Sequence, residues 1–353
     1  MGVSGRCAIR NSGIVGCGDY LPVRVVDNEE ICLDLDSSDQ WIRARSGIRE
    51  RRFAGDGETV PAMAAAAAQD ALAGAGVDPL DVGCVIVATS TYLLQTPSAA
   101  ALVADMIGAR NAAAFDLSAG CSGFNHGLAI AADMVAAGAS EYTVVIGVER
   151  LSDNTDRTDR STAFIFGDGA GAVVVAPTTD NGIGPVVWGS DGSKYDAIRQ
   201  TPSWEELRTD PECERPAVRM NGLEVYRWAT TTMPEVARRI LDLSGLSVAD
   251  LDAFVPHQAN LRITDCLTRA LDIDPARTVV ATAVEIHGNT SAASVPLAVA
   301  DLLRTGTSRA GDTALLLAFG AGLSWAGQVV TLPPPPPPPA HRAVAVDVMA
   351  GAL

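Results

Sequence analysis

The sequence predicts an α/β protein built from two similar halves. Short β-branched runs alternate with alanine-rich segments along most of the chain, which is typical of α/β layers. The second half also repeats motifs of the first in weak form. AFVPHQAN (253–260) is similar to VIVATSTY (85–92), and FGAGLSWAGQVV (319–330) is similar to FGDGAGAVVV (166–175). We therefore expect two βα halves with related topology.

The halves are expected to meet near TTDNGIG (178–184), whose composition favours turns. The first half then covers residues 1–178 and the second covers residues 179–332. Seven consecutive prolines follow, from 333 to 339, and predict a stiff extended segment. We expect the tail from 333 to 353 to lie outside the fold.

Four strands are expected in the first half, in the runs CVIVATS (84–90), AAAFDLS (112–118), YTVVIGVE (142–149) and GAVVVAP (171–177). A helix is expected before them, because Pro61 stands at the start of an alanine-rich run that ends at Gly76. A second helix is expected over 123–137 and is closed by Gly138.

The last part of the second half contains an uncharged stretch, 313–332, that is long enough to span a bilayer. Gly320, Gly322 and Gly327 divide it into short β-rich runs, so a buried hairpin is the better prediction. Residues 191–219 are rich in charge and proline, and we expect an insertion or a flexible loop there, of a length that is often functional.

The composition narrows the possible functions. A net charge of −16 argues against nucleic acid as a general partner. The seven cysteines are scattered and include no CxxC pair, so neither a metal site nor disulfides are indicated. GCGDYL (16–21) lacks the third glycine of a dinucleotide fingerprint, and no GxxxxGK[ST] occurs. No apolar run follows the N-terminal arginines. We expect a cytoplasmic protein that acts away from membranes and without a tightly bound cofactor.

Cys121 is the first candidate for chemistry. It lies in AFDLSAGCSGFNHG, between a predicted strand and a predicted helix, so that its sulfur would stand at a helix N-terminus. The helix dipole and free N–H groups at that position favour thiolate. Most cysteines are simply small buried hydrophobic residues, and the local context alone leaves both interpretations open.

His257 is the second candidate, because it ends an apolar strand in AFVPHQAN, a common position for a catalytic side chain in α/β folds. The other histidines are less informative: His126 shares the predicted helix after Cys121 and is expected to be packed or on the surface, and His341 lies in the tail. Asn289, in EIHGNTSAASVP, is the third candidate. It could cap a helix, or donate hydrogen bonds to a developing oxyanion or enolate.

Taken in order, seven motifs of the chain closely resemble those of the β-ketoacyl-acyl-carrier-protein synthase III family, in the thiolase-like superfamily. The resemblance runs from about residue 14 to residue 332. The motifs are GCGDYLPVRVVDNEEI, SSDQWIRARSGIRERR, AFDLSAGCSGF, DRSTAFIFGDGAGAVVV, FVPHQANLRI, HGNTSAASVP and FGAGLSWAG. The resemblance implies a thiolase-like fold with an α/β/α/β/α arrangement of layers, and a homodimer.

The resemblance also implies a mechanism. Cys121 would take an acyl group from acyl-CoA, and loss of CO₂ from malonyl-carrier protein would give an enolate that attacks the acyl-enzyme. His257 and Asn289 would stabilise the enolate, while the backbone N–H groups of Cys121 and Ala321 would form the oxyanion hole. Many relatives have glycine at position 321, but alanine keeps the N–H donor.

Further positions of the resemblance concern substrates. Trp41, Arg45 and Arg160 match positions that hold coenzyme A, and Asn260 matches a residue of the pantetheine tunnel. The remaining matched positions are the acyl-pocket residues Thr96 and Phe319 and the carrier-protein docking residues Arg227 and Arg262. The loop 92–98 would close the acyl pocket of the neighbouring subunit, where Thr96 replaces the phenylalanine of some relatives and predicts room for longer or branched starters.

The leading hypothesis is therefore a decarboxylating ketosynthase that begins a fatty-acid or polyketide chain. The segment 191–219 and the unusual tail incline this interpretation towards polyketide priming. A second hypothesis is an acyltransferase that passes the acyl group to a hydroxyl or amine without loss of CO₂, although Asn289 argues against it. The third is a non-catalytic carrier-protein-binding subunit, against which the intact Cys121 counts.

Overall fold

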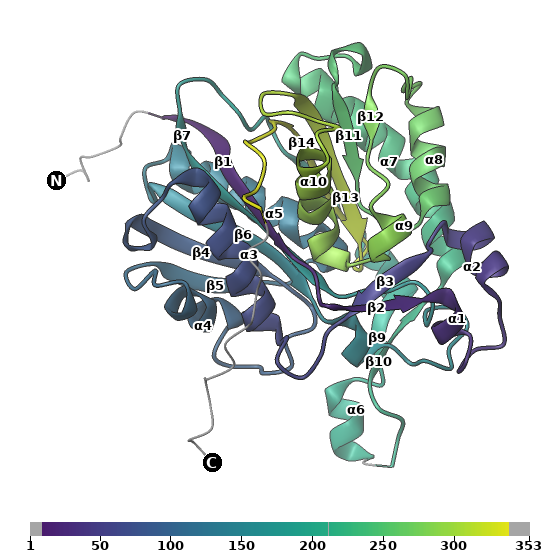
Figure 1. The fold of residues 1–353 in the computed structure, drawn as a ribbon. Helices are drawn as coiled ribbons and strands as arrows, with labels where there is room; N and C mark the ends of the chain where they lie inside the picture. The colour runs from purple at the N-terminus through teal and green to yellow at the C-terminus, as the bar shows by residue number, and fades with distance from the viewer. Residues whose placement is uncertain (1–8, 211, 339–353) are drawn as a thin grey trace.

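The computed structural model describes residues 9–210 and 212–338 and contains two five-stranded sheets (Figure 1). The first sheet has the order β1 (Asn11–Tyr20), β7 (Gly169–Thr178), β6 (Tyr142–Glu149), β4 (Val82–Ala88), β5 (Ala113–Leu117). In it β4 runs parallel to β5 and β6, whereas β7 is antiparallel to β6 and β1.

The second sheet has the order β8 (Val187–Ser190), β14 (Ser324–Thr331), β13 (Thr313–Gly320), β11 (Ala253–Pro256), β12 (Val279–Val280). Its strand directions repeat those of the first sheet, because β11 is parallel to β12 and β13 while β14 is antiparallel to β13 and β8. By this topology β11 corresponds to β4 and β14 to β7, the pairs that the weak sequence repeat joined.

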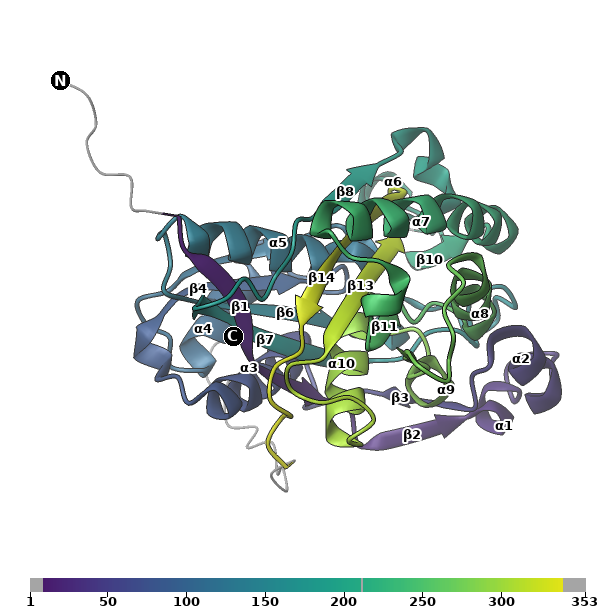
Figure 2. The same cartoon turned by 90° about the horizontal axis from the view of Figure 1, so that it is seen from above.

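Helices and sheets form five layers (Figures 1 and 2). The helices α5 (Gly123–Ala136) and α10 (Ser294–Arg304) lie between the two sheets and share one core with both of them. The outer face of the first sheet is covered by α3 (Val60–Ala75) and α4 (Ala99–Met106). The outer face of the second sheet is covered by α7 (Gly222–Ser244) and α8 (Leu261–Ala270). The predicted α/β/α/β/α order of layers is confirmed.

The strands are apolar on both faces because both faces are covered. In β6, Val144 and Ile146 face the outer helices, and Val145 faces the central layer. In β13, Leu315 faces the outer core and Leu316 the central one. This arrangement explains why these strands read as continuous hydrophobic runs in the sequence. The predicted hairpin is formed by β13 and β14, and no described helix is long and apolar enough to span a membrane.

Residues 191–219 are more regular than the sequence suggested. They contain β9 (Ile198–Thr201) and α6 (Trp204–Thr209), and β10 (Ala217–Met220) pairs with β9 as a hairpin that projects from the body in Figure 1. The expectation of an irregular loop was wrong, whereas the alternative expectation of an insertion stays a prediction. Two features order the segment: a local capping box at Ser203 starts α6, and Arg219 forms ion pairs with Asp156 and Asp159, which are distant in the sequence.

A group of four short elements precedes α3. It contains β2 (Arg24–Asp27), α1 (Asn28–Ile31), α2 (Asp39–Ser46) and β3 (Glu50–Phe53), and it lies beside α8 and α9 (Val284–His287) of the second half (Figure 1). The fully buried Arg51 anchors it, donating to the carbonyl oxygen of Phe164 at 2.7 Å and to Asn28 Oδ1 at 2.9 Å. Elements of the first half thus pack against helices of the second half.

The start of the proline segment contacts the fold. Arg304 Nη1 on α10 donates to the carbonyl oxygen of Pro337 at 3.1 Å, and Cys17 Sγ lies 3.5 Å from the carbonyl oxygen of Pro334. Residues 333–338, expected to lie outside the fold, therefore lie against it. The rest of the expected tail, 339–353, and His341 with it, is outside the described residues.

Candidate active site

Cys121 sits on a tight turn, Gly120–Ser122, between β5 and α5. Gly120 has φ +52°, and a Cβ atom placed there would lie 3.1 Å from the backbone nitrogen of Ala321. A Cβ atom on Gly320 would lie 2.8 Å from Cys121 Cβ and 3.1 Å from Sγ. The turn that carries Cys121 and the end of β13 can approach this closely only because both contribute glycine.

The Cys121 thiol is not a ready thiolate. Burial raises the pKa of Cys121 to about 11, although the nearby Ser291 side chain and the backbone N–H of Cys121 itself pull it down. The sequence predicted that the helix terminus would favour the thiolate. Desolvation is the larger effect on the pKa of this half-buried cysteine. Deprotonation must therefore be assisted when the sulfur reacts.

His257 follows directly after β11. Its backbone N–H donates to the carbonyl oxygen of Leu317 at 2.7 Å, and its Nδ1 lies 2.6 Å from the Oγ of Ser294, the first residue of α10. The imidazole packs edge-on against the Phe319 ring, with 5.4 Å between the centroids. Burial lowers the pKa of His257 to about 3, so the ring is uncharged near neutral pH.

Asn289 is held from both sides of its backbone and by its own side chain. Its N–H donates to the carbonyl oxygen of Ile165 at 2.9 Å, and its Oδ1 accepts from the Ser291 N–H at 2.8 Å. Because Oδ1 is engaged, the Nδ2 group is left to donate into the cavity that Asn289 lines. The side chain does more than cap the turn that follows.

These three side chains come from separate segments and meet around the end of β13. Phe319 contacts His257, Gly320 contacts Cys121, and the Asn289 turn places Ser291 beside the Cys121 sulfur. The result is a half-buried thiol near two buried and uncharged hydrogen-bonding groups. This arrangement suits acyl transfer followed by stabilisation of a developing oxyanion or enolate.

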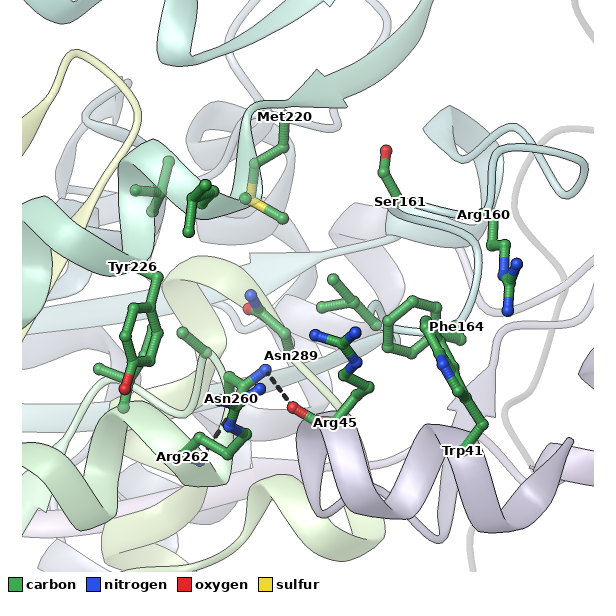
Figure 3. Close-up of a pocket in the computed structure, with 16 residues that line it drawn as sticks. Trp41, Arg45, Arg160, Ser161, Phe164, Met220, Tyr226, Asn260, Arg262 and Asn289 are labelled. Atoms are coloured by element: carbon green, nitrogen blue, oxygen red, sulfur yellow. Dashed lines mark hydrogen bonds between the residues drawn. The ribbon is translucent and has the colours of Figure 1, made fainter. Parts of the chain in front are cut away.

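A cavity of about 500 Å³ opens next to this site (Figure 3). Its outer rim holds a cationic and aromatic group: Arg160 Cζ lies 4.8 Å and Arg45 Cζ 5.4 Å from the centroid of the Trp41 ring. Asn289 lies deeper in the same cavity. A ligand with a flat ring and several phosphates could bind at the rim and reach the buried site with a long arm.

The opposite wall comes from α7 and α8. Asn260 is the N-cap of α8, where its Oδ1 accepts from the Arg262 N–H at 2.9 Å and its Nδ2 donates to the carbonyl oxygen of Arg45 at 3.1 Å. It therefore lines the cavity and also ties α8 to α2. Figure 3 shows Met220, at the end of β10, on the wall that faces these residues.

Comparison with known proteins identifies the family. Residues 115–192 match the 3-oxoacyl-[acyl-carrier-protein] synthase III model, and residues 241–332 match the model of its C-terminal part. A β-ketoacyl-[acyl-carrier-protein] synthase III of Streptomyces glaucescens is 52% identical over 320 residues, which cover 91% of this chain and 96% of that protein. The chain belongs to the β-ketoacyl-acyl-carrier-protein synthase III family.

Further proteins are similar to this chain over nearly its whole length. A mycobacterial β-ketoacyl-[acyl-carrier-protein] synthase III of Mycobacterium avium is 49% identical over 92% of this chain and 96% of that protein. Among solved structures, the priming β-ketosynthase of the R1128 polyketide biosynthetic pathway has 47% identity and a TM-score of 0.93, and the match covers 95% of this chain and 100% of that one. The chain thus has the thiolase-like fold of this family.

The structure brings together most of the residues that the family resemblance selected. Cys121, His257, Asn289, Ala321 and Phe319 surround the buried site. The coenzyme A positions lie together at the cavity: Trp41, Arg45, Arg160 and Asn260. Arg262 lines this cavity, while Arg227 lines an adjacent one on α7.

Thr96 is the exception, because it is exposed on the loop between β4 and α4 and does not line the cavity of its own chain.

Three further side chains of the site carried no recognised signal in the sequence, namely Ser294, Ser291 and Glu149. Ser294 and Ser291 do stand in the motif HGNTSAASVP, but nothing in a string of small residues shows which hydroxyls reach the candidate side chains His257 and Cys121. His126, expected to be packed or on the surface, stacks on Trp188 with 5.6 Å between the centroids.

Proposed function

We propose that this member of the synthase III family transfers an acyl group from acyl-CoA to Cys121 and condenses it with malonyl-carrier protein, releasing CO₂. The observation that carries the proposal is the placement of two uncharged and buried donors, His257 and Asn289, near the half-buried thiol of Cys121. A neutral imidazole and an amide can stabilise the oxygen of an enolate without protonating its carbon. Simple acyl transfer to an alcohol or amine has no use for the second donor.

In the first half-reaction Cys121 Sγ attacks the thioester carbonyl, and coenzyme A leaves as its thiol. The backbone N–H groups of Cys121 and Ala321 are proposed to receive the oxyanion, since the two residues lie on closely packed turns. In the second half-reaction the carboxylate of the malonyl group leaves as CO₂, and its electron pair forms the enolate. The enolate carbon then attacks the acyl carbonyl, and Sγ departs.

The decisive assay supplies the protein with an acyl-CoA and malonyl-carrier protein labelled in the free carboxyl group. We expect labelled CO₂ and a β-ketoacyl-carrier protein in equal amounts. Acylation of Cys121 with no release of CO₂ would mean that the protein is an acyltransferase instead. Binding of carrier protein without acylation would favour a non-catalytic subunit.

The rim of the cavity is proposed to hold the coenzyme A nucleotide, with Trp41 between the guanidinium groups of Arg45 and Arg160. Trp41→Ala removes this platform but leaves the buried site intact. We expect the KM for acyl-CoA to rise about tenfold with little change in kcat, because the platform binds substrate and transition state alike. The matched control is Trp204→Ala, an exposed tryptophan on α6. Equal KM values for wild type and Trp41→Ala would show that the rim is not part of the binding site for acyl-CoA.

The carrier protein is proposed to dock beside the cavity mouth. Arg262 and Arg227 are both exposed there, on α8 and α7. Their charge would attract the phosphopantetheine end of an acidic carrier even though the whole chain carries a net charge of −16. The local patch, and not the net charge, would set the rate of association.

A homodimer is proposed to form through the free edge of the first sheet. The edge strand β5 pairs only with β4 among the described strands, and the surface near it exposes apolar side chains: Leu93, Leu94, Leu102 and Phe115. An open strand edge with an apolar rim favours pairing with a second copy. The dimer would bring the exposed loop 92–98, with Thr96, to the acyl pocket of the neighbouring subunit.

The size of Thr96 predicts which starters are accepted. In a competition among acetyl-, propionyl-, butyryl- and branched-chain CoA, we expect the larger acyl groups to label wild-type Cys121 at least as well as acetyl. Thr96→Phe should disfavour the larger groups about tenfold relative to acetyl, because one or two methylenes must then be excluded. Intact-protein mass spectrometry reads both results, and Thr96→Ser serves as the control. A clear preference of the wild type for acetyl-CoA would contradict this role of Thr96.

A further inference from the structure

Glu149, at the end of β6, is a fully buried carboxylate next to the nucleophile. Its Oε1 accepts from Ser90 Oγ at 2.9 Å and lies 3.0 Å from Ser291 Oγ. Its Oε2 accepts from Thr91 Oγ1 at 2.7 Å and from the Ser90 N–H at 3.1 Å. Within the residues that the structure describes, Glu149 has no ion pair. The site therefore keeps a buried acid whose hydrogen bonds come from hydroxyl groups and one backbone amide.

Ser291 connects this acid to the sulfur. Its hydroxyl donates to Glu149 Oε1 at 3.0 Å, and its turn, Ser291–Ala293, packs against the Gly120–Ser122 turn that carries Cys121. Ser291 adopts φ +48°, a left-handed conformation that is unfavourable for serine, two residues after Asn289. A backbone held in this strained form, with its hydroxyl between a thiol and a carboxylate, indicates a position that serves the chemistry.

The number of protons on these groups fixes the direction of proton transfer between Cys121, Ser291 and Glu149. A serine hydroxyl has one proton, so when Ser291 donates to Glu149 its oxygen can only accept from Cys121. Thr91 is in the corresponding position on the other carboxylate oxygen: its Oγ1 accepts from the Arg150 N–H at 2.8 Å, so its proton goes to Glu149. A proton can therefore pass in one direction only, from the thiol to the hydroxyl and from the hydroxyl to the carboxylate.

We propose that Glu149, acting through Ser291, is the acceptor of the Cys121 proton during acylation. The S–H bond of Cys121 breaks as its proton moves to Ser291 Oγ, and the proton of that hydroxyl moves to Glu149 Oε1. The sulfur keeps the electron pair that attacks the thioester, and Glu149 becomes a neutral acid. When the coenzyme A thiolate leaves, Glu149 gives the proton back through Ser291 Oγ to that leaving sulfur, since Cys121 Sγ is now bonded to the acyl carbon. This inference rests on the proposed acylation of Cys121.

The surroundings of Glu149 are consistent with this role. Cys121 is the titratable side chain that interacts with it, and the neighbouring strand β7 begins after Asp168, a buried carboxylate with its own donors at Ala54 and Ser152. Burial raises the pKa of Glu149, as it raises that of Cys121. A more basic carboxylate is the better proton acceptor for a weakly acidic thiol. His257 is uncharged and forms its hydrogen bond with Ser294, so it takes no part in the path from Cys121 to Glu149.

The test separates a proton acceptor from a neighbouring charge, because the two predict opposite signs. As a neighbouring charge, Glu149 raises the pKa of the thiol, so Glu149→Gln would make Cys121 more reactive near pH 7. As a proton acceptor, its loss should slow acylation about 100-fold, the usual contribution of general base catalysis. The rate should then climb about tenfold per pH unit between pH 6 and 9, since hydroxide has to remove the proton.

We would measure single-turnover acylation by acetyl- and butyryl-CoA, and alkylation by iodoacetamide, for wild type, Glu149→Gln and Ser291→Ala. Asp168→Asn is the matched control, because it also removes a buried carboxylate and should change both rates less than twofold. Slower reaction of both variants with steeper pH dependence supports the inference. An unchanged or faster rate in either variant overturns it.

If Glu149→Gln fails to fold, Ser291→Ala, checked by circular dichroism, decides the question. If no acyl-CoA labels the wild type, the proposed function fails. The alkylation rates then still test the proton path, because iodoacetamide needs no substrate site.

Discussion

Cys121→Ala is expected to abolish the acyl-enzyme and to lower the overall condensation rate by about 10³-fold or more. The reason is geometric as well as chemical, because no other described cysteine lies at the junction of the Asn289 turn and the end of β13. Incubation with acyl-CoA followed by intact-protein mass spectrometry reads the acyl group directly.

The control for this experiment is Cys266→Ala, which removes a half-buried cysteine from α8. This variant should gain the same acyl mass as the wild type. An acyl group that still appears on Cys121→Ala would show that the nucleophile lies elsewhere, and the proposed path through Ser291 and Glu149 would fall with it.

Asn289→Ala is expected to separate the two half-reactions. Loss of its Nδ2 donor should lower CO₂ release by about 10²- to 10³-fold, in the range found when one oxyanion-hole donor is removed. Acylation of Cys121 should stay within a few-fold of the wild-type rate, because the proposed oxyanion hole of that step uses backbone N–H groups. The measurement compares labelled CO₂ with acyl-enzyme formed in the same sample.

His257→Ala should show the same separation, and the pH dependence adds a second test. With the pKa of His257 at about 3, the ring stays neutral from pH 5 to 9. Decarboxylation by preformed acyl-enzyme should therefore show no titration near pH 6.5, the usual pKa of histidine. A decarboxylation rate that falls through pH 6.5 as the pH is lowered would mean that a charged imidazole forms, contrary to the buried geometry.

For Asn289→Ala, an equal loss of acylation and CO₂ release would assign Asn289 to both steps.

The same low pKa has a consequence for stability. In the unfolded chain His257 binds a proton below about pH 6.5, whereas in the folded protein it stays neutral down to about pH 3. The unfolded state therefore gains protons first as the pH falls. The contribution of this histidine to stability is complete above pH 6.5 and is lost as the pH falls towards 3.

Much of the fold was readable from the sequence because it depends on local patterns. Buried strands read as continuous β-branched runs, and the helix over Val60–Ala75 was marked by Pro61 and Gly76 at its ends. The weak repeat predicted the two equivalent sheets. Residues 191–219 were misread since their order comes from ion pairs of Arg219 with distant Asp156 and Asp159, and no local pattern shows such contacts.

The sequence by itself determined the family, the two halves and the three residues that carry the proposed chemistry, since each stands in a motif of its own. Only the tertiary structure decided what surrounds them. It placed Ser294 on His257, and it placed Ser291 and Glu149 beside Cys121, from segments far apart in the chain. It also raised the pKa of the Cys121 thiol by burial, against the lowering expected from the helix terminus. The physical reason is that pKa values and proton paths depend on burial and on the neighbours that folding supplies, which motif order does not encode.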